Sequence, residues 1–172
     1  NDWTEMKFIL DNDTLYVPCK LSDLMDYGYK LKDSDVIGDI VKPNYTAQLI
    51  LYKDNGLAIT VLAQNRTSSS LRIEALDVSS IKMSKEDIGF YTSNSKYNKE
   101  NLPELILFGG ITWDIRYEHL AERFGSEFYM REKSNGDYVS TFEKLAKTLV
   151  ITTNNYKDIK EVHMSIDLDF KD

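Results

Sequence analysis

The strongest local constraint on the fold is the triplet Asp54-Asn55-Gly56, which lies between two apolar runs. An Asn-Gly pair readily adopts the left-handed backbone of a tight hairpin turn, and alternating residues on both sides complete the signature. We therefore expect strands at residues 45–52 and 57–63. This hairpin favours an antiparallel sheet.

Turn residues separate short apolar runs elsewhere in the chain too. Gly, Asn, Asp and Ser supply the backbone conformations and local hydrogen bonds of turns, and the runs between them have the length of strands. Eleven tyrosines and seven phenylalanines also suit strands, where aromatic rings pack on a pleated surface. The further strands predicted in this way span residues 7–10, 14–17, 71–76, 78–83, 128–131, 139–149 (with a break) and 162–170.

Two short segments repeat their apolar residues at the spacing of an α-helix instead. A glycine follows each of them, as is common where a helix ends. The residues concerned are Leu21, Leu24 and Met25 before Gly28, and Tyr117, Leu120, Ala121 and Phe124 before Gly125. We therefore expect an α+β fold, mostly antiparallel strand, with two short helices.

The chain is long enough to build one domain with its own core. A domain of 172 residues buries roughly 70% of its unfolded surface, and 42% of these residues are hydrophobic. Cys19 is the single cysteine, so no internal disulfide forms and we expect it to act as a small buried hydrophobe. The residues that we expect in the core are Leu24, Ile59, Val61, Leu120, Phe124 and Ile166.

The order of the predicted elements occurs twice along the chain. In each half a strand leads to a short helix and a glycine, and antiparallel strands follow. We infer a single domain, residues 1–172, made of two similar units at 1–84 and 105–172. The polar stretch 85–104 is then the connection between them.

The charge balance excludes some partner classes. The net charge is −7, with 28 acidic and 21 basic residues. Nucleic-acid affinity depends on Lys and Arg neutralising phosphates, so we expect no nucleic-acid partner, and anionic membranes are disfavoured for the same reason. No run of about 18 apolar residues predicts a transmembrane helix. Because the chain begins at Asn1 and not at a methionine, the lack of a leader carries no conclusion.

No sequence pattern indicates catalytic, cofactor-binding or metal-binding residues. A metal site takes three or four ligands, whereas His119 and His163 are far apart in sequence. Residues 33–39 have the spacing of a calcium loop, but Ile37 occupies a ligand position. P-loop, Rossmann and nucleophile-elbow motifs are absent. We therefore expect no enzyme and no cofactor; the alternative is a hydrolase whose carboxylates converge in three dimensions.

Two groups of residues resemble known families. One resembles the helix motif of the β-lactamase-inhibitor-protein-like fold, which small outer-membrane assembly lipoproteins share. Its residues are Gly109-Gly110-Ile111-Thr112-Trp113, Tyr117-Glu118-His119-Leu120 and Phe124-Gly125. The other resembles an uncharacterised family of secreted proteins and lipoproteins of Gram-positive bacteria. Its residues are Trp3, Phe8, Leu10-Asp11, Tyr16-Val17-Pro18-Cys19, Ser22-Asp23-Leu24 and Gly28-Tyr29.

The resemblance implies an extracytoplasmic chain, secreted or lipid-anchored at the cell surface. We expect a non-enzymatic binding or protein-interaction module with a protein partner at the cell envelope, and the alternative is a carbohydrate- or peptide-binding module. Exposed aromatic residues together with asparagines suit either role. The candidates are Trp113 and Tyr117 at the second helix, and Tyr91 and Tyr97 in the polar stretch; the alternative is that they belong to the core.

The strand predicted at residues 162–170 supplies the candidate partner surface. Alternation places His163, Ser165, Asp167 and Asp169 on the face away from the helices. An acidic face favours a basic partner, with an affinity that falls as salt rises. The alternative is that these residues only keep the surface soluble.

Overall fold

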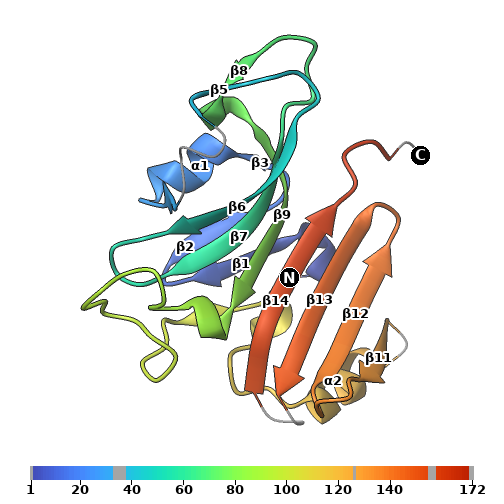
Figure 1. Cartoon of the computed structure of the whole chain (residues 1–172). Coiled ribbons are helices and arrows are strands. Elements are labelled where there is room, and N and C mark those ends of the chain that lie inside the picture. The colour runs from blue at the N-terminus through green and yellow to red at the C-terminus, as the bar shows by residue number, and fades with distance from the viewer. Residues whose placement is uncertain (1, 33–37, 126, 155–157, 171–172) are drawn as a thin grey trace. The chain divides into compact units, whose positions relative to one another are not determined.

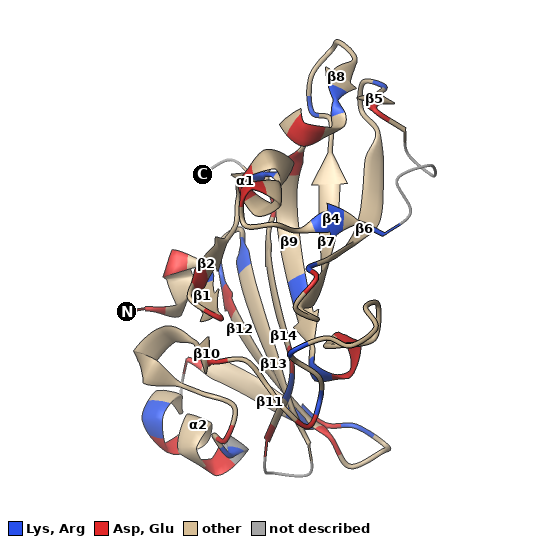
Figure 2. Cartoon of the chain, turned by 90° about the vertical axis from the view of Figure 1, so that its left-hand side faces the viewer, with Lys and Arg blue, Asp and Glu red and all other residues tan. Residues whose placement is uncertain are grey.

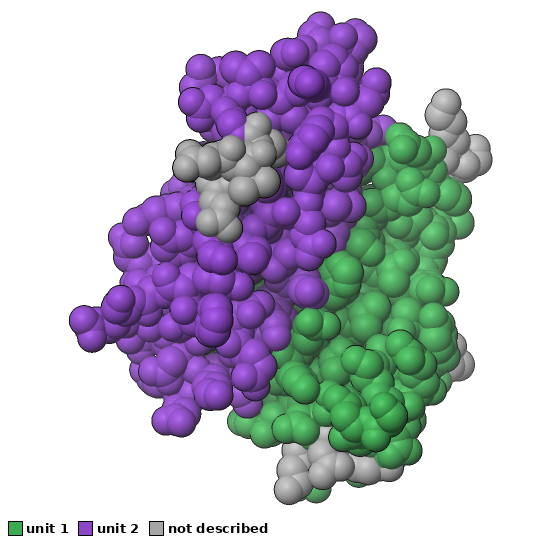
Figure 3. All heavy atoms as spheres, in the orientation of Figure 1, with its two compact units in different colours: residues 1–16, 103–172 green, residues 17–102 purple. Residues whose placement is uncertain are grey.

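The computed structural model describes residues 2–32, 38–125, 127–154 and 158–170. The chain divides into two compact units, which Figure 3 colours separately. Unit 1 comprises Asn1–Tyr16 and Pro103–Asp172, and unit 2 comprises Val17–Leu102.

Unit 1 contains a helix followed by four antiparallel strands in sequence order (Figure 1). These elements are α2 (Tyr117–Phe124), β11 (Phe128–Glu132), β12 (Tyr138–Lys144), β13 (Lys147–Asn154) and β14 (Asp158–Ile166). A second, three-stranded sheet has the order β10-β1-β2. Its strands are β1 (Lys7–Leu10), β2 (Asp13–Tyr16) and β10 (Leu105–Ile106), and the 3-10 turns of the unit are η1 (Trp3–Glu5) and η5 (Phe108–Gly110).

The core of unit 1 is built around Phe142 on β12, whose side chain is fully buried. Four other rings surround it, with centroids 5.0–5.9 Å from its own. They belong to Trp3, Phe108, Phe124 and Phe128 and come from four separate elements. Aromatic pairs at these separations add to the stabilisation from burial alone. This cluster therefore joins the N-terminal segment of the unit to its helix and sheet.

Unit 2 also has a helix followed by antiparallel strands, paired in the order β4-β6-β7-β9. These elements are α1 (Leu21–Asp26), β4 (Lys30–Leu31), β6 (Thr46–Tyr52), β7 (Ala58–Gln64) and β9 (Asp77–Ser84). Two short pairs complete the unit, with β3 against β9 and β5 against β8. The remaining elements are β3 (Cys19–Lys20), β5 (Ile40–Val41), β8 (Leu71–Arg72), η3 (Ile73–Ala75) and η4 (Lys85–Asp87).

The expected α+β class, mostly antiparallel strand with two short helices, is confirmed. The Asp54-Asn55-Gly56 turn joins β6 to β7, as predicted. The two helices have six and eight residues, and a membrane span takes about 20. Within the described ranges, therefore, neither helix is long enough to cross a bilayer.

The structure divides the chain differently from the expected units at 1–84 and 105–172. The hairpin of β1 and β2 belongs to unit 1, because Ile9 of β1 pairs with Ile106 of β10. Residues 85–102 belong to unit 2 and are not a separate connection. Local periodicity predicts each strand but not its distant partner, so it does not place the first hairpin.

Several predicted strand ends are wrong. The strand expected at 162–170 ends at Ile166, and the one expected at 71–76 ends at Arg72 and continues as a 3-10 turn. The expected break within 139–149 is a turn at Leu145, between β12 and β13. Residues 33–37 of the calcium-like stretch lie outside the described residues.

Four of the six expected core residues are fully buried: Leu24, Ile59, Val61 and Leu120. The other two, Phe124 and Ile166, are half-buried. Each is the last residue of its element, α2 and β14 respectively. The end of an element is more open than its middle, and the spacing of apolar residues does not reveal this.

Replacing Phe142 by alanine should lower the free energy of unfolding by about 3–5 kcal/mol, because it removes the centre of the aromatic cluster. Tyr129→Ala is the matched control, since this side chain is 55% exposed on the neighbouring strand β11. The control should change stability by no more than about 0.5 kcal/mol. Chemical denaturation measures both values, and equal losses would show that the core has been placed wrongly.

Candidate functional site

The candidate partner surface on β14 is only partly formed. Val162 and Met164 are buried while His163 and Ser165 are half-buried, so the expected alternation holds within the strand. Asp167 and Asp169 lie beyond its end at Ile166. The Asp169 backbone N–H donates to Asp167 Oδ1 over 3.0 Å, and the Asp167 N–H donates to the Ala146 carbonyl over 2.9 Å. The aspartates therefore belong to a turn and do not share the strand face.

The residues considered for metal or thiol chemistry remain apart. His119 is exposed on α2, and His163 is half-buried on β14. In the part of the chain that the structure describes, no three His, Cys, Asp or Glu side chains form a metal-binding group. Cys19 is buried as expected, and burial, together with the Asp23 and Asp77 carboxylates, raises the pKa of its thiol to about 12. This thiol is therefore protonated at neutral pH and a poor nucleophile.

The segment 85–102, which we call the long loop, is attached to the β6–β7 hairpin turn of unit 2. The Gly89 N–H donates to the Gly56 carbonyl over 2.7 Å, and the Tyr97 N–H donates to the Asn55 carbonyl over 2.9 Å. The Thr92 hydroxyl donates to a third carbonyl of the same turn region, that of Lys53, over 3.3 Å. The long loop is thus held by hydrogen bonds to a tight turn.

Two glycines make this close approach possible. Gly56 has a φ of +106°, and a Cβ placed on it would lie 2.4 Å from the Tyr97 carbonyl oxygen. Gly89 has a φ of +80°, and its Cβ would lie 2.8 Å from the same oxygen. Residues that carry a side chain rarely adopt these φ values, and a Cβ at these distances would overlap with the carbonyl oxygen. Both positions therefore require glycine, on steric and conformational grounds together.

A pocket of about 460 Å³ opens on the long loop. Phe90 forms one side of it and is 74% exposed, whereas Ile88, two residues earlier, is buried. We call this the loop pocket; its lining residues are Glu86, Asp87, Ile88, Gly89, Phe90, Asn98 and Lys99. It combines an exposed aromatic ring with two carboxyl groups, an amide and an amine.

Aromatic rings continue from the loop pocket to the sheet. The centroids of Phe90 and Tyr91 are 5.0 Å apart in an edge-to-face arrangement, and those of Tyr91 and Tyr52 are 6.5 Å apart. We call Phe90, Tyr91 and Tyr52 the aromatic row. Lys32 Nζ lies 5.2 Å from the Tyr91 ring centroid and Lys30 Nζ lies 5.8 Å from that of Tyr52, within cation–π range. Lys30, on β4, is among the basic residues coloured blue in Figure 2.

Two groups near the loop pocket have altered pKa values. Burial raises the pKa of the Asp87 carboxyl group; Lys82 opposes this shift, and Glu86 adds to it. Burial also raises the pKa of the Tyr91 hydroxyl, and the Asp87 carboxylate adds to that shift. Ionised Asp87 is therefore less stable here than in water, while Tyr91 keeps its proton and can donate a hydrogen bond.

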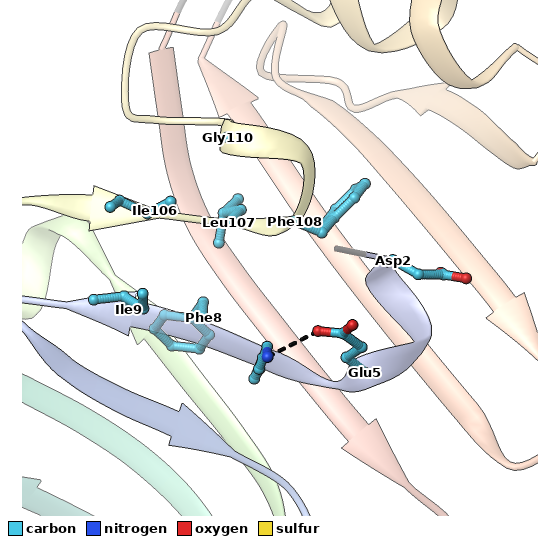
Figure 4. Close-up of a pocket in the computed structure, with 9 residues that line it drawn as sticks. Asp2, Glu5, Phe8, Ile9, Ile106, Leu107, Phe108 and Gly110 are labelled. Carbon is cyan, nitrogen blue, oxygen red and sulfur yellow. Dashed lines mark ion pairs between the residues drawn. The ribbon is translucent and has the colours of Figure 1, made fainter.

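A smaller pocket of about 140 Å³ lies in unit 1 (Figure 4). Its walls come from residues 2–9 and 106–110, and include the apolar side chains of Phe8 and Ile106. Two of its three charged residues, Glu5 and Lys7, form an ion pair of 2.9 Å with each other. Because this pocket is smaller and Asp2, its third charged residue, already accepts a hydrogen bond from the Thr4 N–H, the loop pocket is the stronger candidate site.

Sequence reasoning identified the long loop only in part. Tyr91 was a candidate recognition aromatic and lies in the aromatic row, but Tyr97 is buried. Trp113 is buried as well, and its indole N–H donates to the Pro103 carbonyl over 2.7 Å. Phe90 was missed. The available signal was the run Gly89-Phe90-Tyr91, a glycine and two aromatics inside an otherwise polar stretch.

Gly56→Ala should destabilise the protein more than Gly110→Ala. Both glycines have positive φ, +106° and +76°, so both variants carry a left-handed backbone strain of about 1–2 kcal/mol. At Gly110 nothing lies within 4 Å of the added Cβ, whereas at Gly56 it meets backbone. Chemical denaturation gives the difference, and limited proteolysis should cut the long loop faster in Gly56→Ala. Equal behaviour of the two variants would contradict the close approach.

Comparison with protein-family models, with curated proteins and with solved structures finds no match for this chain. Any function assigned to it therefore rests on its own residues. Those that carry most information are the loop pocket, the aromatic row and the glycine contacts beneath them.

Proposed function

We propose that this chain is a non-enzymatic binding or protein-interaction module that acts outside a bacterial cell, secreted or lipid-anchored at its surface. The resemblance of the opening segment, from Trp3 to Tyr29, to secreted proteins and lipoproteins of Gram-positive bacteria motivates the location. The aromatic row beside the loop pocket is the observation that carries the binding role.

The physical case rests on Phe90. A phenylalanine ring that is 74% exposed contributes little burial to its own unit, whereas fully burying such a ring against a partner is worth about 1.5–3 kcal/mol. The long loop is held by Gly56 and Gly89, so little conformational freedom is lost when a partner binds. Large aromatic side chains in fixed positions are the residues that most often dominate binding interfaces.

This proposal moves the contact surface from β14 to unit 2. Of the four residues first considered, His163 and Ser165 are half-buried, and Asp167 and Asp169 lie in a turn. The long loop offers a larger exposed apolar side chain and a pocket beside it. We therefore assign the partner at the cell envelope to the long loop.

A hydrolase is the second candidate. Glu86 and Asp87 line the same pocket, and a carboxyl group with a raised pKa is typical of a general acid. A hydrolase would convert its ligand, and Asp87→Asn would abolish that conversion. A binding module would release its ligand unchanged.

Phe90→Ala should weaken binding to isolated cell-envelope fragments of Gram-positive bacteria about tenfold, because the variant loses the ring that a partner would bury. A tenfold loss of affinity corresponds to about 1.4 kcal/mol. The bound fraction is measured by co-sedimentation over a range of protein concentrations. Leu145→Ala is the matched control, because Leu145 is an equally exposed apolar residue (76%) in unit 1.

The control should bind like the unmodified chain. If the unmodified chain does not bind envelope fragments, the proposed function is wrong. If both variants lose affinity equally, the contact is non-specific and the long loop is not the binding site.

A further inference from the structure

The first clue to the ligand of the loop pocket is the shape of its aromatic wall. Phe90 offers an apolar ring without any polar atom, and Tyr91 stands at 81° to it with centroids 5.0 Å apart. An apolar ring face suits a ligand that has a flat apolar face of its own. The C–H face of a sugar ring is such a surface.

The second clue is the hydrogen-bond acceptor that Asp87 offers to a ligand. Its carboxyl group is half-buried, and among the described residues no group donates a hydrogen bond to it. Because the group is only half-buried, water can hydrate it in the free protein, and a ligand hydroxyl can take the place of that water. Asn98 is already used, because its Oδ1 accepts from the N–H groups of Glu100 and Asn101, both over 2.9 Å. Asp87 is therefore an acceptor that a ligand hydroxyl can reach.

The third clue is the balance of charge around the pocket and the aromatic row. Lys99 lies 3.8 Å from Glu86, and Lys30 lies 2.6 Å from Asp54. The charged residues here are of both signs: Lys30, Lys32, Lys82 and Lys99 against Asp54, Glu86 and Asp87. A ligand of either charge would therefore meet some like charges as well as opposite ones. A neutral ligand avoids this repulsion.

From these three observations we propose that the loop pocket binds a neutral carbohydrate, with a sugar ring stacked on Phe90 and a ligand hydroxyl donating to Asp87. This inference rests on the proposed function and names its ligand class. A protein partner with an apolar side chain is the competing occupant, but it offers no paired hydroxyls beside an apolar face.

Selective destruction of the envelope tests the inference directly. Envelope fragments are treated with periodate, which cleaves the vicinal diols of sugars, or digested with protease, and binding of the chain is measured by co-sedimentation. Periodate should remove most of the binding, and protease should leave it within about twofold of the untreated level. The glycan released from protease-digested envelopes should compete for binding.

Two variants and one change of solvent sharpen the result. Phe90→Ala should weaken glycan binding about tenfold. Asp87→Asn should weaken it severalfold, because an amide oxygen is a weaker acceptor than a carboxylate. Leu145→Ala should not change it. Raising the salt concentration should leave the affinity nearly unchanged, as expected for an uncharged ligand.

Weaker glycan binding by Asp87→Asn would not be a consequence of lower stability, because the substitution should not destabilise the fold. Burial raises the pKa of Asp87 in the folded chain. At neutral pH, where the carboxyl group is ionised, this group therefore lowers the free energy of unfolding. This destabilising effect disappears as the pH falls through the pKa of Asp87 in the folded state, because the folded state then takes up the proton. Asp87→Asn should therefore be at least as stable as the unmodified chain at pH 7, and the two should converge in acid.

Other outcomes overturn the inference while leaving the proposed function in place. Binding that depends on Phe90 but is lost on protease digestion and survives periodate identifies a protein partner. A steep loss of affinity with salt identifies a charged ligand. If untreated envelopes do not bind the chain at all, the proposed function itself fails.

Discussion

Three stretches of backbone in unit 2 meet at Gly56 and Gly89, closer together than any side chain would allow. The hairpin turn, the residues around Gly89 and the carbonyl of Tyr97 approach to distances at which an added Cβ would overlap with backbone atoms. Hydrogen bonds from Gly89 to Gly56 and from Tyr97 to Asn55 hold the contact. The positions of Phe90 and Tyr91 follow from it, because they directly succeed Gly89 in the chain. A polar loop of this length thereby acquires a defined surface.

The two units use their aromatic residues in opposite ways. In unit 1, rings from four elements close around Phe142 and leave it no exposed surface. In unit 2, Phe90 is largely exposed and Asp87 is partly buried without a hydrogen-bond donor among the described residues. Most of the Phe90 ring therefore gains nothing from burial in its own unit, and burial of Asp87 disfavours its ionised form. Features that cost stability cluster at functional sites, because binding and folding make different demands on the same residues. The loop pocket has this character.

The sequence predicted what local chemistry determines. The Asp54-Asn55-Gly56 turn carries its own conformational preference, so the β6–β7 hairpin follows from a few residues. The pairing of β1 with β10 and the contact of Gly89 with Gly56 join distant residues, and no local pattern indicates them. For this reason the long loop was expected to be a connection. The alternation that continued past Ile166 was also misleading, since Asp167 forms a turn with its own side chain.

In the candidate site, too, the sequence predicts single residues but not the contacts between distant ones. Tyr91 attracts attention as an aromatic in a polar stretch, but its neighbours Tyr52 and Lys32 come from other elements. The loop pocket is defined by this tertiary arrangement. Amide hydrogen exchange tests that arrangement most directly, through the N–H groups of Gly89 and Tyr97. If the long loop is built into unit 2, both should exchange as slowly as amides of the β6–β7 hairpin, well below the rate of an open chain. Exchange at the open-chain rate would show that the contact does not form, and the pocket would lose its basis.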